Sequence, residues 1–368
     1  MKKAAAAHKP FSPDKIFAHA ERIDQWLKTG LSHPVTFELD ITNFCNNQCP
    51  GCFGFYKGLS GEIMKFSEIE DILRQIAKFG GKAVTFTGGG EPLTHPHFIQ
   101  ALELAKNLGL DTALISNGLA LNEKIADAVL KNCSWTRISL DASEPESYRK
   151  THGMGWQAYA KVLANITMLA ERKHHLNSKC TVGVGFLTHS GADHNVYDFA
   201  ALCKKLGVDY AQYRPILSRH GEKRLDYSAK TVLAEMQRAK KEFSCSDFSV
   251  FCSEHKYAKI SEGRTARSYE VCYGHNFAAV ICANLKMYLC CHMRGMEKYC
   301  LGDLRKNTLA EIWKSAQRKQ AYNSINFKDC PPLCRCDSFN TILWEIKEGR
   351  LPRENWPKGL VWEHENFI

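Results

Sequence analysis

The chain has 368 residues, 44% of them hydrophobic and 24% charged, so it is long enough to enclose a large core and ordinary in composition. No apolar run is long enough to span a bilayer, and the first residues lack the apolar stretch of a signal peptide, so we expect a cytoplasmic protein without membrane contact. The net charge of +10 fits an acidic partner, but the basic residues are scattered, which disfavours nucleic acid as the main ligand.

An amphipathic helix is predicted at about residues 13–29. Beyond it, apolar β-branched segments alternate with helical patterns, several of which end at a glycine. The predicted strands are 35–41, 83–88, 111–117, 135–141, 180–188 and 209–217. The predicted helices are about 67–79, 96–108, 122–132, 156–174 and 195–206. Six consecutive βα units predict an α/β fold with a partial (β/α)6 barrel, in which parallel strands lie inside and helices outside.

The composition changes after a basic helical stretch at 229–243. Ten of the sixteen cysteines lie between Cys245 and Cys336, together with two short strand-like segments, NFAAVICA and KMYLCC. We therefore expect a small cysteine-rich α+β domain at 245–345. The remaining parts are expected to be an N-terminal helix (1–34), the barrel (35–225), a connecting helix (226–244) and a C-terminal tail (346–368).

Sixteen cysteines in a reducing compartment indicate metal binding or chemistry more than disulfides. Three of them, at CxxxCxxC spacing in CNNQCPGC (45–52), directly follow the first predicted strand. Structural zinc sites and iron–sulfur clusters usually take four protein ligands, so a cluster on three thiolates leaves one iron open. The loops GGGEP, SNG and DASEP follow the next three strands. We expect all four loops to meet, because the carboxyl ends of parallel strands share one edge.

CxxxCxxC after the first strand, with GGEP after the second, resembles the radical S-adenosylmethionine (SAM) superfamily over roughly residues 35–217. The resemblance implies a [4Fe–4S] cluster on Cys45, Cys49 and Cys52, with SAM at the fourth site. It also implies reductive cleavage of SAM to a 5′-deoxyadenosyl radical, which abstracts hydrogen from a substrate. The electron donor would be a carrier such as flavodoxin or ferredoxin.

The same resemblance implies a set of SAM contacts on the loops after the strands. In GGEP the Glu91 carboxylate would receive the SAM amino group. Many family members carry an aromatic residue just before the third cysteine; this chain has Gly51 there, and Phe53 is the substitute for contacting adenine. The expected cofactor-binding residues are Phe53, Gly89, Gly90, Glu91, Asn117, Ser139, Asp141 and Arg149.

The C-terminal cysteines resemble the Twitch and SPASM extensions of the superfamily, which carry auxiliary [4Fe–4S] clusters. The segment LGDLRKNTLAEIWKS is similar to the stretch that separates their cysteine groups. The implied ligands are Cys272, Cys290, Cys330, Cys334 and Cys336, and Cys291 could replace Cys290. Five thiols favour one cluster, since a second would have to recruit Cys282, Cys291 and Cys300. A zinc ribbon is the structural alternative.

An auxiliary cluster in such enzymes accepts an electron from the substrate, which implies an oxidoreductase of the dehydrogenase or epimerase type. We expect a small, sugar-like or other natural-product substrate, because the short lead before Val35 leaves no room for a peptide-recognition domain. Arg214 and Gln212, at the end of the sixth strand, are the expected substrate contacts, since a guanidinium can clamp a carboxylate or phosphate. A peptide maturase that cross-links or epimerises, and an RNA-modifying enzyme, remain alternatives.

Overall fold

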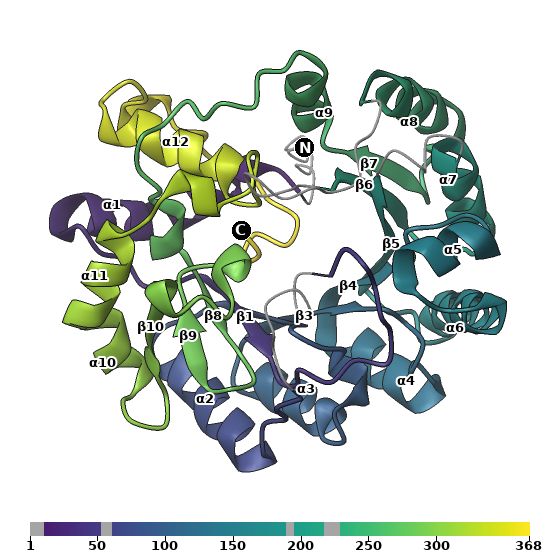
Figure 1. Cartoon of the computed structure of the whole chain (residues 1–368), viewed down its shortest axis with the longest axis horizontal. Helices are drawn as coiled ribbons and strands as arrows, with labels where there is room; N and C mark the ends of the chain where they lie inside the picture. Colours follow the sequence, from purple (N-terminus) through teal and green to yellow (C-terminus); the bar gives the residue numbers. More distant parts are fainter. Residues whose placement is uncertain (1–10, 53–60, 189–194, 217–228) are drawn as a thin grey trace, which may run out of the picture.

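The structure is a computed structural model that describes residues 11–52, 61–188, 195–216 and 229–368. Ten strands form one sheet in the order β10-β9-β8-β1-β2-β3-β4-β5-β6-β7. Figure 1 shows these strands as an open arc around the centre of the molecule, with α2 to α8 on the outside. The predicted partial barrel with a cysteine-rich C-terminal region is therefore confirmed.

The six predicted parallel strands all form, and each pairs with the next along the chain. They are β1 (Thr36–Asp40), β2 (Ala83–Thr87), β3 (Asp111–Ser116), β4 (Cys133–Ser139), β5 (Thr181–Thr188) and β6 (Tyr210–Pro215). The connections contain α2 (Phe66–Lys78), η3 (Pro92–Thr94), α3 (Phe98–Asn107), α4 (Glu123–Asn132), α5 (Pro145–His152), α6 (Trp156–His175) and α7 (Val196–Lys205). Among these α-helices only α5 was not predicted, because its eight residues are few and mostly polar.

The two faces of the sheet differ in chemistry because side chains alternate along a strand. In β1, Phe37 and Leu39 pack into the main core beneath the outer helices, so Glu38 and Asp40 point to the inner face. In β4, Ile138 packs outward in the same way, and Arg137 lies on the inner face. The inner face of the arc therefore holds buried charges.

The C-terminal region is built onto the edges of this sheet. After α8 (Ala229–Phe243), β7 (Ser249–Cys252) pairs with β6, and β8 (Ala278–Ile281) pairs in parallel with β1. Next come β9 (Lys286–Tyr288) and β10 (Cys300–Asp303). The predicted segment KMYLCC contains β9, whereas β10 was not predicted. The other elements are α9 (Glu254–Ser261), η5 (Gly274–Asn276), η6 (Cys291–Met293), η7 (Glu297–Tyr299), α10 (Leu309–Lys314), α11 (Ala316–Asn323), η8 (Phe327–Asp329), α12 (Asp337–Lys347) and η9 (Arg353–Asn355).

The beginning and end of the described chain lie together. The predicted N-terminal helix is a 3-10 helix, η1 (Pro13–His19), that continues into α1 (Ala20–Thr29). A second core cluster joins it to α12 through Ile23, Trp26 and Leu343. The last residues run to the centre of the arc (Figure 1), where Phe367 packs edge-on against Trp135 of β4 at 5.5 Å.

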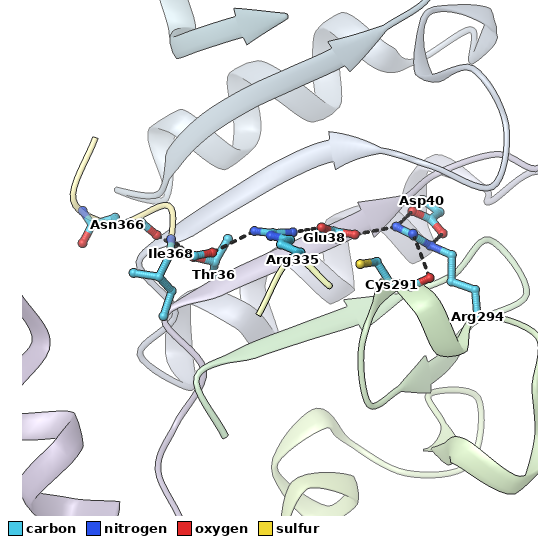
Figure 2. Close-up of polar contacts among 8 residues, drawn as sticks. All are labelled: Thr36, Glu38, Asp40, Cys291, Arg294, Arg335, Asn366 and Ile368. Atoms are coloured by element: carbon cyan, nitrogen blue, oxygen red, sulfur yellow. Dashed lines mark hydrogen bonds and ion pairs between the residues drawn. The ribbon is translucent and has the colours of Figure 1, made fainter. Parts of the chain in front are cut away.

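Four charged side chains connect β1 to the C-terminal region (Figure 2). Arg294 donates from Nε to Asp40 at 2.7 Å and from Nη2 to Glu38 at 2.6 Å, and all three side chains are buried. Arg335, between two cysteines of the C-terminal region, also pairs with Glu38. Burial lowers the pKa of Arg294, but the Asp40 carboxylate outweighs it and the pKa lies above its ordinary value. We call Glu38, Asp40, Arg294 and Arg335 the β1 ion network.

Replacing Arg294 with methionine is expected to lower the free energy of unfolding by about 3–5 kcal/mol, because Asp40 would stay buried without its cation. Denaturant titration of the reconstituted protein measures this. The matched control is Arg305→Met: that side chain is 56% exposed in its pair with Asp303, and exposed pairs contribute about 0–1 kcal/mol. Equal losses in the two variants would show that the buried network does not hold the C-terminal region in place.

Candidate active site

The three cysteines of CxxxCxxC lie in the loop that leaves the carboxyl end of β1. We call Cys45, Cys49 and Cys52 the barrel cysteines; all three are half-buried and none forms a disulfide. The loop turns back on itself where the Cys52 N–H donates to the Cys49 carbonyl at 3.1 Å. The sulfurs are close enough that the charge of Cys52 raises the pKa of Cys45, and the charges of Cys52 and Cys45 raise the pKa of Cys49. One loop thus gathers three thiols at the edge of the sheet.

Nitrogen atoms of the backbone and of a histidine ring lie close to two of these sulfurs. The Asn47 N–H donates to the Cys45 sulfur at 3.4 Å, and Nδ1 of His152 lies 3.3 Å from the Cys49 sulfur. Nε2 of His152 donates to the Leu140 carbonyl at 3.0 Å, so a neutral ring accepts at Nδ1. His152 comes from the end of α5 and is buried. It fixes the cysteine loop against the loop after β4.

The barrel cysteines suit a cluster in their chemistry. Burial raises the pKa of Cys45 to about 11, and burial raises that of Cys49 further. Buried thiols therefore keep their protons near neutral pH unless a metal cation takes the place of those protons. Three thiols in one loop, with N–H donors at the Cys45 sulfur, fit an iron–sulfur cluster that has one iron not bound by cysteine.

The glycine-rich loop after β2 packs directly against the cysteine loop. Gly90 donates its N–H to the Thr42 carbonyl at 2.9 Å, and Glu91 donates its N–H to the Phe44 carbonyl at 2.8 Å. A Cβ atom at Gly90 would lie 2.1 Å from the Phe44 carbonyl oxygen, so a side chain does not fit there. The glycine is needed for this close approach of two backbones.

The Glu91 carboxylate joins the glycine-rich loop to the loop after β3. Its Oε1 accepts from the Leu93 N–H at 3.0 Å and from the Ser116 hydroxyl at 2.7 Å, and its Oε2 accepts from the Asn117 N–H at 2.7 Å. A carboxylate offers about four acceptor positions. One position therefore remains for a further donor, and the expected contact with the SAM amino group stays a prediction.

The structure brings most of the other expected SAM contacts to the same edge. The Asn117 amide donates to Asn46 of the cysteine loop at 2.6 Å. Asp141 adopts a left-handed backbone (φ 52°), and its Oδ1 accepts from the Leu187 N–H at 2.6 Å. Its Oδ2 lies 3.4 Å from Nε2 of His152. Ser139 is the last residue of β4, next to this loop.

Two expected contacts are not placed there. Arg149 lies on the exposed side of α5, where its side chain is 62% exposed and pairs with Glu146 at 2.8 Å. His152, a turn further along the same helix, is the basic side chain that reaches the cysteine loop. Phe53 lies outside the described residues.

Six thiols of the C-terminal region form a second group. Each lies close enough to others of the group for their charges to raise its pKa, or to raise the pKa of a neighbour. We call this set the C-terminal cysteine group: Cys272, Cys290, Cys291, Cys330, Cys334 and Cys336. Burial raises the pKa of Cys272 to about 12 and places that of Cys290 well above its ordinary value.

Cys282 and Cys300 lie in a small apolar cluster with Val280 and Tyr288, and Cys291 of the C-terminal cysteine group packs against that cluster. Two cationic side chains lie beside the C-terminal cysteine group. Lys256 donates to the Cys334 carbonyl at 3.3 Å, and Arg267 donates to the Pro331 carbonyl at 2.8 Å. A cluster with four thiolates is an anion, so neighbouring cations suit it.

Within the described ranges, no group of three or more His, Cys, Asp and Glu side chains converges closely enough to hold a single metal ion. In the same ranges, no helix combines the length and the apolar character that crossing a membrane requires.

Comparison with known families agrees with this geometry. Residues 39–200 match the family model of the radical SAM superfamily, and residues 272–337 match that of the SPASM iron-sulfur cluster-binding domain. The chain belongs to the radical SAM superfamily and carries a C-terminal SPASM domain. Its cofactors are accordingly SAM and [4Fe–4S] clusters. The resemblance inferred from the motifs is thus confirmed.

Individual relatives match parts of the chain. GTP 3′,8-cyclase from Alkaliphilus metalliredigens is 36% identical over 120 residues, which cover 30% of this chain and 36% of that protein. The structure of SuiB from Streptococcus suis bound to precursor peptide SuiA aligns with a TM-score of 0.63 and 15% identity, covering 84% of this chain and 72% of SuiB. Native anSMEcpe with bound AdoMet aligns with a TM-score of 0.61 and 16% identity, covering 86% and 96%. At these identities the two structures establish a shared fold.

Sequence reasoning missed the β1 ion network and Arg137. A signal was present: Glu38 and Asp40 in the first strand stand at alternate positions, as do Gln212 and Arg214 in the sixth. Alternating polar residues within strands of a barrel indicate an inner face that holds charge.

Replacing any one barrel cysteine with alanine is expected to abolish SAM cleavage and remove about four irons per chain. The C-terminal cysteine group should keep its iron, since its ligands are intact. Iron analysis and a 5′-deoxyadenosine assay measure both effects, and Cys245→Ala, at an exposed thiol, is the control. Formation of 5′-deoxyadenosine by all three variants would refute the assignment of these ligands.

Glu91→Gln is expected to weaken SAM binding about tenfold or more, because a charge-assisted hydrogen bond contributes roughly 1.5–3 kcal/mol. The new amide would also point a donor at N–H groups that now donate to the carboxylate. Equilibrium dialysis with SAM measures the affinity. Glu70→Gln is the control, since Glu70 pairs with Arg74 on an exposed helix face. An unchanged SAM affinity would show that Glu91 joins the loops and does not contact SAM.

Proposed function

We propose that this chain cleaves SAM reductively and uses the 5′-deoxyadenosyl radical to abstract hydrogen from a small, sugar-like or other natural-product substrate. The observation that carries the proposal is the contact between the cysteine loop and the glycine-rich loop, which leaves no room for a side chain at Gly90. These loops present three thiols and a buried carboxylate at one edge of the sheet.

Each residue at this edge has a proposed task. Cys45, Cys49 and Cys52 hold the cluster, which supplies one electron for SAM cleavage when it is bound and reduced. Flavodoxin or ferredoxin is the proposed source of that electron. Glu91 orients the SAM amino group. The other SAM contacts proposed on the loops are Gly89, Gly90, Asn117, Ser139 and Asp141.

The C-terminal cysteine group is proposed to hold one auxiliary cluster, whose chemistry there is that of an acceptor for the substrate electron. The ligands are proposed to come from Cys272, Cys290, Cys330, Cys334 and Cys336. Five thiols suffice for one cluster with four thiolate ligands, which supports a single cluster. With an electron acceptor, the net reaction would be an oxidation of dehydrogenase type.

Peptide modification is the second candidate function. SuiB, whose fold this chain shares over 84% of its length, has been solved with a precursor peptide bound. GTP 3′,8-cyclase, one of the relatives matched by sequence, is named for a nucleotide. The reduced enzyme is incubated with SAM and with panels of sugars, nucleotides and peptides, and 5′-deoxyadenosine is measured. This experiment distinguishes a small-molecule substrate from a peptide substrate. A rise with peptides alone would replace the small-molecule proposal.

Removing one auxiliary ligand is expected to uncouple SAM cleavage from substrate oxidation. Cys334→Ala should lose about four irons per chain and still form 5′-deoxyadenosine, but without oxidised product. The matched control is Cys282→Ala, at a buried thiol of the same region. This variant should keep its full iron content and still form oxidised product. Circular dichroism first checks folding, because small metal-bound domains fold with their metal. Full product yield from folded Cys334→Ala would exclude the electron-acceptor role.

A further inference from the structure

Two arginines on the inner face of the sheet are held without a carboxylate partner. Arg137 of β4 is only 6% exposed, and its Nη1 donates to Oε1 of Gln212 on β6 at 2.7 Å. The Nε atoms of Arg137 and Arg214 are both buried and, among the described residues, make no hydrogen bond. Buried N–H groups without partners are rare and costly, so their presence calls for an explanation.

The strand between the two arginines is shaped to admit them. β5 lies between β4 and β6 in the sheet. At Gly185 of β5, an added Cβ would lie 3.2 Å from Cδ of Arg137, and at Gly183 it would lie 2.0 Å from the ring of Tyr210. Missing side chains on β5 therefore let Arg137 lie across the strand and reach Gln212.

Among the described residues, no carboxylate contacts either guanidinium group, and the charge of Asp141 acts on both from a distance. Burial, and then the nearby charge of Arg214, lower the pKa of Arg137 to about 9; burial also lowers the pKa of Arg214. The pKa of Arg294, on the same inner face, is raised instead, and Asp40 and Glu38 contact this arginine directly. Two uncompensated cations side by side destabilise a fold unless an anion joins them.

Arg214 also lies between the two cysteine groups. In register it stands beside Leu187, whose N–H donates to Asp141 at the edge of the barrel cysteines. The charges of Asp141 and of Cys291, in the C-terminal cysteine group, both act on Arg214. A substrate that gives hydrogen on one side and an electron on the other has to lie between these groups.

We propose that Arg137 and Arg214, positioned by Gln212, form an oxyanion subsite for the substrate, which therefore carries a carboxylate or a phosphate group. The inference rests on the proposed function, and it narrows the substrate class. Paired guanidinium groups bind the oxygens of such anions through several N–H donors at once.

The test uses the reconstituted holoenzyme with inorganic phosphate and malonate as probes, against chloride at equal ionic strength. Binding of either probe should raise the thermal midpoint of the wild type. Arg214→Met and Arg137→Met should each weaken that binding about tenfold or more, since hydrogen bonds to charged groups are strong. The control is Arg74→Met, at an exposed arginine that pairs with Glu70. The probe with the larger shift identifies phosphate or carboxylate as the recognised group.

A second readout separates a binding role from a structural one. Without probe, Arg214→Met should be at least as thermally stable as the wild type, because the change removes an uncompensated charge. A clear loss of stability, or equal shifts with phosphate, malonate and chloride in the wild type, would overturn the proposal. A tenfold loss of SAM affinity with unchanged probe binding would assign the arginines to the SAM site and overturn it too. SAM cleavage by the wild type is measured in a separate assay. Failure of the proposed function is therefore distinguished from failure of the anion subsite.

Discussion

The β1 ion network is the constraint on which the rest of the structure depends. Asp40 stands at the end of the strand that leads into the barrel cysteines, and Arg335 stands between Cys334 and Cys336. Glu38, Asp40 and Arg294 are buried, and buried charges are expensive to desolvate unless their partners are in place. The network, together with the pairing of β8 with β1, therefore fixes the distance between the two cysteine groups, and with it the space for a substrate.

The inner face of the sheet holds arginines of two kinds. Arg294 is neutralised by carboxylates of the protein and acts as a structural cation. Arg137 is buried and Arg214 is half-buried, and among the described residues no carboxylate contacts either of them, although acidic residues lie elsewhere on the same face. A fold that neutralises one buried cation and leaves two others unbalanced has kept those two for a ligand, which is how strained or unsatisfied groups commonly mark functional sites.

Local patterns in the sequence predicted the six βα units, the cysteine motif and the second cysteine region, because periodicity and motif spacing are encoded in neighbouring residues. They did not predict which side of α5 faces the cysteine loop, so Arg149 was named as a SAM contact although it lies on the exposed side of the helix. Nor did they predict the contacts of Arg294 with Asp40 and Glu38, which are separated by 254 and 256 positions. Pairings of that range leave no local signal and follow only from the complete sheet.

We propose that one chain holds an open cluster and a closed one on either side of the substrate. Electron paramagnetic resonance of the reconstituted, dithionite-reduced protein, recorded with and without SAM, tests it most directly. The account predicts two [4Fe–4S] signals, of which only one changes on addition of SAM, because three thiolates leave an iron open and four do not. A spectrum that SAM leaves unchanged, or a protein that takes up zinc in place of iron, would contradict it.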